Sequence, residues 1–205
     1  MPRERLADAI RKLIDHAVVS DVPDEEVADV AGQLEAIDAR LQAYPRSRFR
    51  PRDLPDFNDL QATFRGDPVM GEHNPLAPPV YVERDGETIY GRVTLGAAYE
   101  GPPGYVHGAV IAGIFDMMMG LANIASGNPG MTGTLKVKYL KPTPLHTELS
   151  LQAKTDRVDG RKIHTVGNLK VGDDVFSEAE AVFVRIRVER ALEYFDKHQR
   201  DNQAR

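Results

Sequence analysis

The stretch GYVHGAVIAGIFDMMMGLANIAS, residues 104–126, decides the fold, because it is the longest apolar segment of the chain. Between Gly108 and Ala125 its only charged side chain is Asp116. A segment this apolar is expected to be buried, and an ionised carboxylate resists burial unless something compensates it. We predict a buried helix whose acid is either a structural partner or a reactive group. Helical spacing predicts that Asp116 faces inward with a set of small and apolar residues: Ala112, Gly113, Met119 and Gly120.

Strand patterns lie on both sides of this helix. Before it, VYVERDGETIYGRVTL (residues 80–95) predicts a hairpin that turns at Asp85-Gly86. After it, Leu135, Val137 and Tyr139 alternate with lysines, as a half-buried strand should. Three further strand-like runs follow, over residues 149–158, 162–171 and 175–186. The order β-β-α-β-β-β-β, with consecutive strands after the helix, favours an antiparallel sheet.

Two amphipathic helices are predicted at the start of the chain. Apolar residues recur at helical spacing over residues 6–18 and again over residues 27–41. Between these patterns, Ser20 and Asp21 are candidate helix caps. We predict a helical hairpin over residues 1–43. Each helix has one narrow apolar stripe, so the pair must pack on itself, on the main domain or on another subunit.

The rest of the chain divides into an arm, a main domain and a tail. Residues 44–79 contain seven prolines, which remove backbone donors and disfavour helix, so an extended connecting arm is expected. The main domain is expected over residues 80–187 and a polar C-terminal tail over residues 188–205. The arm also carries a basic run that we interpret as a solvated surface: Arg46, Arg48, Arg50 and Arg52.

The composition argues against several classes of function. A formal net charge of -5 over 205 residues gives no reason to expect nucleic-acid binding. The chain has no cysteine, which excludes a disulfide framework and a cysteine nucleophile. Its histidines lack metal-binding spacing, and it has no Gly-x-Ser-x-Gly elbow, P-loop or dinucleotide-binding motif. We therefore predict no metal and no bound cofactor.

The sequence also predicts where the protein resides. The first twenty residues alternate charged with apolar side chains and lack the unbroken apolar core of a signal peptide. The apolar segment around Asp116 is the only candidate of membrane length, and its central acid disfavours insertion by roughly 2.5–3.5 kcal/mol. We expect a cytoplasmic protein with no membrane partner.

The start of the buried helix offers a second chemical feature. His107-Gly108 stands there, and the first N–H groups of a helix lack internal partners and lie at the positive end of its dipole. Such groups can hold a carbonyl oxygen as it gains negative charge. Asp116 is eight residues further on, about 12 Å along the axis at 1.5 Å per residue. That is too far to act on a carbonyl held at the start of the same helix, so the spacing suggests a working site between two subunits.

Four blocks of this sequence together resemble one known family. They are HNPLAPPV (residues 73–80), YEGPPGYVHGAVIAGIFDMMMG (99–120), MTGTLKVKYLKPTPL (131–145) and DGRKIHTVGNLKV (159–171). The chain is similar to the PaaI-type hotdog thioesterases of the 4-hydroxybenzoyl-CoA thioesterase superfamily over residues 74–186. The resemblance implies an α+β hotdog fold, in which a curved antiparallel sheet wraps a central apolar helix, here with an added N-terminal helical hairpin. It also implies a homo-oligomer with active sites at the subunit interface.

The resemblance further implies hydrolysis of acyl-CoA thioesters to the free acid and CoA. Asp116 matches the family's catalytic carboxylate, which acts as general base or nucleophile, and Gly108 matches the residue whose N–H polarises the thioester carbonyl. His107 matches the histidine of the family's His-Gly-Gly motif, and Thr132 matches a threonine near the catalytic carboxylate that helps to orient water or the acid. Coenzyme A enters only as part of the substrate. The second glycine of the family's His-Gly-Gly motif is Ala109 here. Positions expected to bind substrate are Asn74, Ala109, Lys138, Lys141, Arg157, Arg161 and Lys162.

Other interpretations of the same residues remain open. Asp116 can be a buried acid satisfied by Thr132, His107 can be a structural residue that fixes the start of the helix, and the basic residues can be solvated charges. Met117, Met118 and Met119 are expected in the core or an interface rather than in an acyl tunnel. The alternative function is a non-hydrolytic acyl-CoA or acyl-carrier binding module whose N-terminal helices dock a partner. An enoyl-CoA hydratase is a weaker third possibility.

Overall fold

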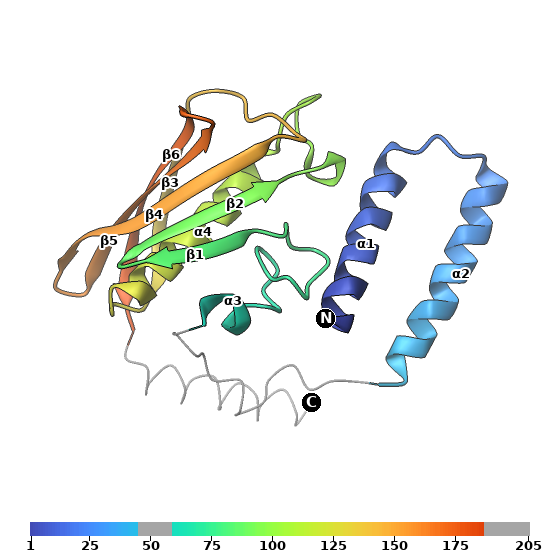
Figure 1. Ribbon diagram of the computed structural model, residues 1–205, viewed down its shortest axis with the longest axis horizontal. Helices are drawn as coiled ribbons and strands as arrows, with labels where there is room; N and C mark the ends of the chain where they lie inside the picture. The colour runs from blue at the N-terminus through green and yellow to red at the C-terminus, as the bar shows by residue number, and fades with distance from the viewer. Residues whose placement is uncertain (45–58, 187–205) are drawn as a thin grey trace.

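A six-stranded antiparallel sheet packs around the long helix α4, Gly108–Ala125, in the computed structural model, which describes residues 1–44 and 59–186 (Figure 1). The strand order is β1-β2-β4-β5-β6-β3, so β1 and β3 form the two edges. The predicted order of strands and helix and the antiparallel pairing are confirmed. The strands are β1 Tyr81–Asp85, β2 Thr88–Thr94, β3 Gly130–Tyr139, β4 Glu148–Asp159, β5 Lys162–Val171 and β6 Asp174–Arg185.

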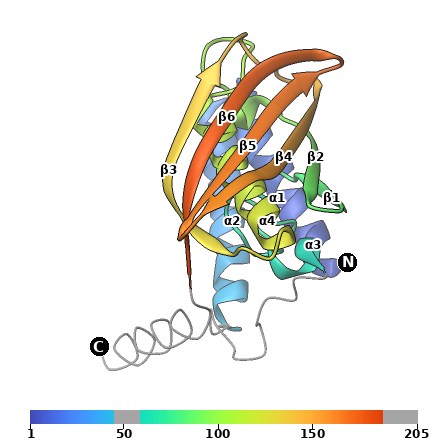
Figure 2. The same cartoon turned by 90° about the vertical axis from the view of Figure 1, so that its left-hand side faces the viewer.

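The strands bury alternate residues because successive side chains of a strand point to opposite faces. In β4, Leu149, Leu151 and Ala153 are buried and face the helix, while the residues between them are more exposed. The same alternation runs through β6 up to Phe183. Seen from the side of the sheet, the strands cross in front of α4 and curve around it (Figure 2). One face of the sheet therefore supplies a large part of the core.

Helix α4 supplies the other half of that core. Its largest buried side chains are Ile111, Ile114, Phe115, Met118, Met119 and Leu121. A buried polar contact also ties it to the sheet: Asn123 Oδ1 accepts hydrogen bonds from Thr165 Oγ1 at 2.6 Å and Thr155 Oγ1 at 3.0 Å. Although α4 is long and apolar enough to span a membrane, half of it is buried inside this fold. It is the core helix of the domain, and Met118 and Met119 belong to that core as predicted.

The predicted burial of Asp116 is wrong for a single protomer. Asp116 is only half-buried and lies on the face of α4 that the sheet leaves open, together with Ala112, Gly113 and Gly120. Met119, expected on the same side, points into the core. The error has a simple cause: the sheet covers only part of the circumference of the helix, so a helix that is apolar all round still has an open face.

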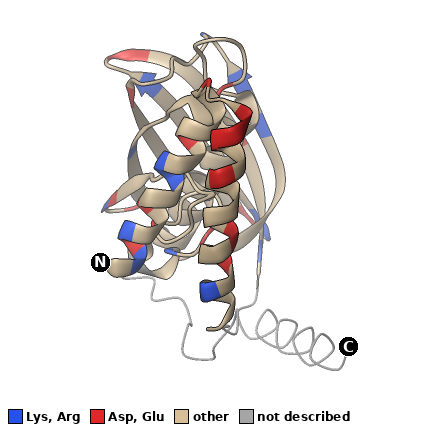
Figure 3. Ribbon diagram, turned by 90° about the vertical axis from the view of Figure 1, so that its right-hand side faces the viewer, with Lys and Arg blue, Asp and Glu red and all other residues tan. Residues whose placement is uncertain are grey.

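Two helices, α1 Pro2–Val19 and α2 Asp24–Gln42, form the predicted N-terminal pair (Figure 1). Neither Ser20 nor Asp21 caps the second helix: α2 begins after Pro23 without a side-chain cap, and Ser20 ends α1. None of the α2 residues, all of which the structure describes, is buried. The apolar stripe of α2 is between 37% and 49% exposed and consists of Val27, Val30, Leu34, Ile37 and Leu41. Figure 3 shows acidic residues along α2 beside the more mixed charge of α1.

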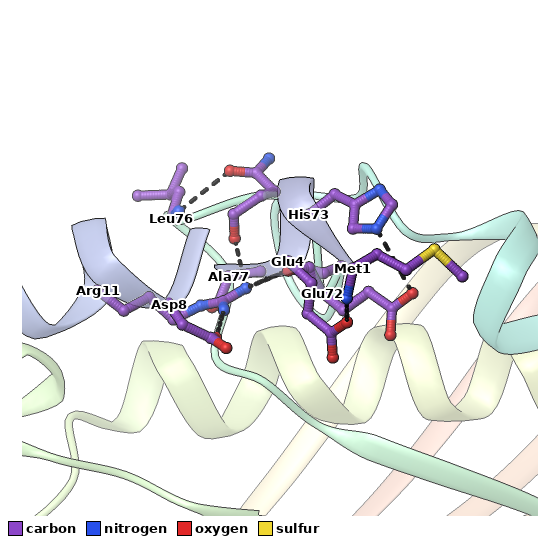
Figure 4. A network of polar contacts seen from close by, with 10 residues as sticks. Met1, Glu4, Asp8, Arg11, Glu72, His73, Leu76 and Ala77 are labelled. Atoms are coloured by element: carbon purple, nitrogen blue, oxygen red, sulfur yellow. Dashed lines mark hydrogen bonds and ion pairs between the residues drawn. The ribbon is translucent and has the colours of Figure 1, made fainter. Parts of the chain in front are cut away.

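Helix α1 docks on the main domain through polar side chains rather than through its predicted apolar stripe. Only Ala7 of α1 is buried. The guanidinium of Arg11 points into the loop over residues 71–77 (Figure 4) and donates to four of its carbonyl oxygens at 2.9–3.1 Å, those of Gly71, Glu72, Asn74 and Ala77. One turn further on, Asp15 Oδ1 accepts from the Ala98 N–H at 2.8 Å, at the short helix η1 Ala97–Tyr99. A Cβ on Gly96 would lie 2.6 Å from the Asp15 carboxylate, so a larger residue at position 96 would displace that carboxylate.

Arg11→Ala is expected to lower the free energy of unfolding by about 1–3 kcal/mol, because it leaves loop carbonyl oxygens without their donor. Arg5→Ala is the matched control, since Arg5 is exposed on the same helix and its side chain makes no hydrogen bond or ion pair with the described residues. The control should change stability by less than about 0.5 kcal/mol. Urea titrations followed by circular dichroism measure both, and equal stability of the two variants would show that Arg11 does not anchor α1.

The connecting arm is described only from residue 59 onward, so the basic run at Arg46, Arg48, Arg50 and Arg52 lies outside the described residues, as does the predicted tail. The described part begins with a short helix, α3 Leu60–Thr63, beside the β1 edge. Gln61 Oε1 accepts from the Val82 N–H of β1 at 3.2 Å. The arm therefore covers part of one edge of the sheet.

Candidate active site

Asp116 and Thr132 lie in direct contact. Asp116 projects from the open face of α4, and Thr132 lies near the start of β3, which passes beside it. The Thr132 hydroxyl donates to Asp116 Oδ1 at 2.7 Å. This bond satisfies one carboxylate oxygen and orients the group, while the open face of α4 leaves the carboxylate accessible from outside the protomer. Such a carboxylate can accept a proton from water or attack an electrophile.

The start of α4 presents an unused backbone donor. His107 is the N-cap of the helix, and its Nδ1 accepts the Ala109 N–H at 3.0 Å. This contact supports the interpretation of His107 as a residue that fixes the start of the helix. The Gly108 N–H has no hydrogen-bond acceptor among the described residues. Tyr139 of β3 donates its hydroxyl to the Gly108 carbonyl oxygen at 2.8 Å and fixes the first turn. The free N–H therefore stands at a rigid helix N-terminus, as an oxyanion donor requires.

The carboxylate and the free N–H are separated within one protomer. Gly108 and Asp116 lie eight residues apart on the same unbroken helix, which corresponds to about 12 Å along its axis. A reacting carbonyl carbon must lie about 3 Å from both the nucleophile and the oxyanion donors. One protomer alone therefore does not assemble both groups around one substrate.

The five basic residues predicted to bind CoA do not form one cluster. Lys138 pairs with Glu178 at 4.0 Å, and Lys141 pairs with Asp174 at 3.0 Å, at one end of the sheet. Arg157, Arg161 and Lys162 lie around the β4–β5 turn at the other end, where Lys162 is opposite Val184. The ten residues of β5 between these ends span roughly 33 Å at about 3.3 Å per residue. Within one chain they are two separate groups.

The hydrogen bonds of Asn74 shape the loop over residues 71–77, which Arg11 also contacts. Its side-chain Nδ2 donates to the Gly66 carbonyl at 3.2 Å, and its Oδ1 accepts the Leu76 N–H at 3.0 Å. Its own carbonyl is one of the four acceptors of Arg11. The contacts of Asn74 are therefore those of a loop-forming residue, and its neighbours Pro75 and Leu76, rather than Asn74 itself, line the nearest groove.

That groove has a volume of about 480 Å³ and lies between α1, the loop over residues 68–79, η1 and the first half of α4. Ala109, Val110 and Gly113 form its α4 side. Asp116 does not line it, although it follows Gly113 by three residues and lies on the same open face of the helix. The substituted position of the His-Gly-Gly motif, Ala109, thus borders this groove, whereas the preceding residue, Gly108, does not line it.

Sequence reasoning missed Tyr139, Arg11 and Asp15 as residues that shape this region. The strand alternation indicated only that Tyr139 is half-buried. Its hydroxyl can donate to a backbone carbonyl, and this property could have identified Tyr139 as a residue that contacts another element. Arg11 and Asp15 act on partners that lie between 60 and 83 positions away in the chain. No local pattern reports contacts over that distance.

Comparisons with known proteins identify the family to which this chain belongs. Residues 103–177 match the family model described as "Thioesterase superfamily". A crystal structure of a thioesterase superfamily protein superposes with a TM-score of 0.80 at 38% sequence identity, and the match covers 89% of this chain and 94% of that one. Because the match covers 89% of this chain, it must include part of the N-terminal helices and part of the arm as well as the main domain. This chain therefore belongs to the thioesterase superfamily, and the predicted hotdog fold and family resemblance are confirmed.

Two relatives named as acyl-coenzyme A thioesterases match over a shorter region. Acyl-coenzyme A thioesterase THEM4 from Xenopus laevis is 33% identical over 93 residues, which is 44% of this chain and 42% of that protein. The protein of the same name from Mus musculus is 32% identical over 99 residues, which is 47% of this chain and 43% of that protein. This chain thus spans less than half the length of both relatives.

Proposed function

We propose that this protein hydrolyses acyl-CoA thioesters to the free acid and CoA. The observation that carries the proposal is the pairing of an accessible, Thr132-oriented carboxylate at Asp116 with a free backbone N–H at Gly108, on one helix of a thioesterase-superfamily fold. The likeness to acyl-coenzyme A thioesterases supports the choice of substrate. Coenzyme A is part of that substrate, and no further cofactor is proposed.

The two groups have complementary tasks in this reaction. The Gly108 N–H binds the thioester carbonyl oxygen and stabilises the negative charge that develops there. On the general-base route, Asp116 takes a proton from an attacking water, the C–S bond breaks, and this proton passes to the leaving thiolate to give CoA as a thiol. On the nucleophilic route, Asp116 attacks the carbonyl carbon, the C–S bond breaks to release the CoA thiolate, and water then hydrolyses the acyl-Asp116 anhydride to the free acid. Thr132 holds the carboxylate in the orientation that either route needs. His107 fixes the first turn of α4 through the Ala109 N–H.

A two-fold dimer joined at β3 brings these groups together. β3 is an edge strand, and most of its side chains are exposed. Along β3, Tyr139 lies beside Gly108 of α4, and Thr132 lies beside Asp116. An antiparallel β3–β3 pairing about an axis between Leu135 and Lys136 would set Thr132 of one copy opposite Tyr139 of the other. Asp116 of one protomer would then lie at the level of Gly108 of its partner.

The same pairing supports a composite site for CoA. It would set the Lys138 end of one sheet beside the Gly130 end of the other, and the β4–β5 turn with Arg161 and Lys162 lies near that end. Basic groups that are far apart in one protomer would therefore flank one shared cleft. Arginine binds phosphate through a planar fork and lysine as a point charge, so both types suit the phosphates of CoA.

Hydrolysis is tested by incubating the protein with acetyl-, octanoyl-, palmitoyl- and benzoyl-CoA and detecting the released thiol. Release well above the uncatalysed rate for at least one of these substrates is expected. Binding of CoA without release from any of them would reject the enzyme and favour the non-hydrolytic binding module.

Mixing two inactive variants should restore activity if the site is shared. Asp116→Ala removes the carboxylate, and Gly108→Pro removes the N–H donor, so each homodimer lacks a complete site. After unfolding and refolding an equal mixture, about a quarter of wild-type activity is expected, because half of the dimers are mixed and each has one intact site. The double variant, with both changes in one chain, is the control. It should stay inactive after the same unfolding and refolding. Absence of recovery, with mixed dimers verified by differently tagged chains, would place the whole site within one protomer.

A further inference from the structure

Helix α1 closes one side of the 480 Å³ groove beside the start of α4. Ile14 lines it from α1, Val69 and Leu76 line it from the loop over residues 68–79, and Val110 lines it from α4. Four prolines also border it, Pro68, Pro75, Pro78 and Pro79. The walls are thus mainly apolar and come from segments that Arg11 and Asp15 hold in place.

The charged residues on the groove walls are already engaged or solvated. The Arg11 guanidinium is used by Asp8 and four backbone carbonyls, and Asp15 accepts the Ala98 N–H. Burial raises the pKa of Tyr99, so its phenol stays neutral at physiological pH. Lys12 is exposed at the rim, where its ammonium can stay in water while its stem borders the groove. The interior therefore offers contacts to an apolar ligand rather than partners for a charged one.

The α4 wall of the groove begins one residue after Gly108, the proposed donor to the thioester carbonyl. Ala109, which lines it, follows Gly108 directly in the chain, and Gly113 extends the same surface by one helical turn. Both residues are small, so the backbone of α4 lies close to the cavity. A carbonyl oxygen held by the Gly108 N–H would leave the attached carbon chain next to this surface.

We infer that α1 is the outer wall of an acyl-binding groove and that Ile14 sets the length of the acyl chain that the groove accepts. This inference rests on the proposed thioesterase function and assigns to the N-terminal helix a part in substrate selection. The volume of about 480 Å³ lies within the range of roughly 300–1,000 Å³ typical of sites that enclose small organic ligands. The substrate class is therefore the CoA thioester of an uncharged, medium-chain acyl group.

The direct test changes the size of the residue at position 14. Ile14→Trp fills the groove, so kcat/KM for octanoyl-CoA should fall about tenfold or more, the effect of losing burial of about two methylene groups. Hydrolysis of acetyl-CoA, which has too short a chain to enter, should change by less than about twofold. Ile14→Ala enlarges the groove and should raise kcat/KM for tetradecanoyl-CoA relative to octanoyl-CoA.

Val18→Trp is the matched control, because Val18 lies one turn further along α1, is 59% exposed and does not line the groove. It should leave the chain-length profile unchanged. If Ile14→Trp lowers activity equally for acetyl- and octanoyl-CoA, or leaves both unchanged, the groove is not the acyl site. Urea unfolding of each variant shows whether α1 remains docked.

A binding measurement separates this inference from the proposed hydrolysis. Calorimetric titration of the Asp116→Ala variant with octanoyl-CoA and with CoA gives the contribution of the acyl group without turnover. Octanoyl-CoA should bind at least about tenfold more tightly than CoA, and adding Ile14→Trp should abolish that difference. If the wild-type protein hydrolyses no acyl-CoA while octanoyl-CoA still binds more tightly than CoA, the assignment of the groove as the acyl site holds and the catalytic proposal fails. Equal affinities for octanoyl-CoA and CoA would overturn the groove assignment, whatever the turnover.

Discussion

Asp116→Ala should lower kcat for acyl-CoA hydrolysis by at least about a hundredfold, the scale expected when a general base is lost. Asp116→Asn should do the same, because an amide keeps the size of the side chain but neither takes up a proton nor attacks a carbonyl carbon. KM should change much less than kcat, since the carboxylate acts in the transition state rather than in binding. Steady-state kinetics with the best acyl-CoA substrate measure both constants.

Neither replacement should unfold the protein. Asp116 is half-buried on the open face of α4, its only side-chain partner among the described residues is Thr132, and alanine has the highest helix propensity. Glu87→Ala, in the exposed turn between β1 and β2, is the control and should retain wild-type activity. Turnover by Asp116→Ala at the wild-type rate would remove the central residue from the proposed mechanism.

Gly108→Pro should lower kcat by about 10²–10³-fold, the loss seen when one oxyanion donor is removed. Proline removes the N–H without breaking the helix, because Gly108 is the first residue of α4, where proline fits the helical backbone. His107 already has φ -64° and ψ 132°, a conformation that favours a following proline. The substitution therefore removes the donor with little change to the fold.

Gly108→Ala is the matched control for this prediction. It adds a Cβ that would lie 3.3 Å from the ring of Tyr139, a contact that proline also makes, but it keeps the N–H. Any cost of the added carbon is therefore shared by both variants. If alanine lowers kcat as much as proline does, the effect is steric, and the Gly108 N–H is not the oxyanion donor.

The fold could be predicted from the sequence because its signals are local. One long apolar segment marked α4, and period-two alternation around Leu135 marked a strand. What the sequence did not reveal is how far the sheet reaches around the helix. A residue such as Asp116 has the same neighbours in sequence whether the face it occupies is covered or open, so its burial was misjudged.

The candidate site was predictable to a similar degree. Gly108 and Asp116 lie on one helix that His107 caps, so their spacing along the chain was enough to give their separation. The contact of Thr132 with Asp116 followed from the family resemblance rather than from a pattern in the residues. The docking of α1 was not predictable, because its apolar periodicity pointed to one face while Arg11 and Asp15 engaged loops from another.

The two edges of the sheet differ in a way that limits assembly. The β1 edge is only five residues long, carries Glu83, Arg84 and Asp85, and gives its Val82 N–H to Gln61 of the arm. Charge, short length and a covering segment all discourage a further strand from adding there. Of the two edges, β3 is therefore the better suited to pairing, and the proposed symmetric dimer would use that edge in both copies. In the proposed dimer, no free edge suited to extension would remain in the described part of either sheet, so the pairing would close instead of continuing into a fibre.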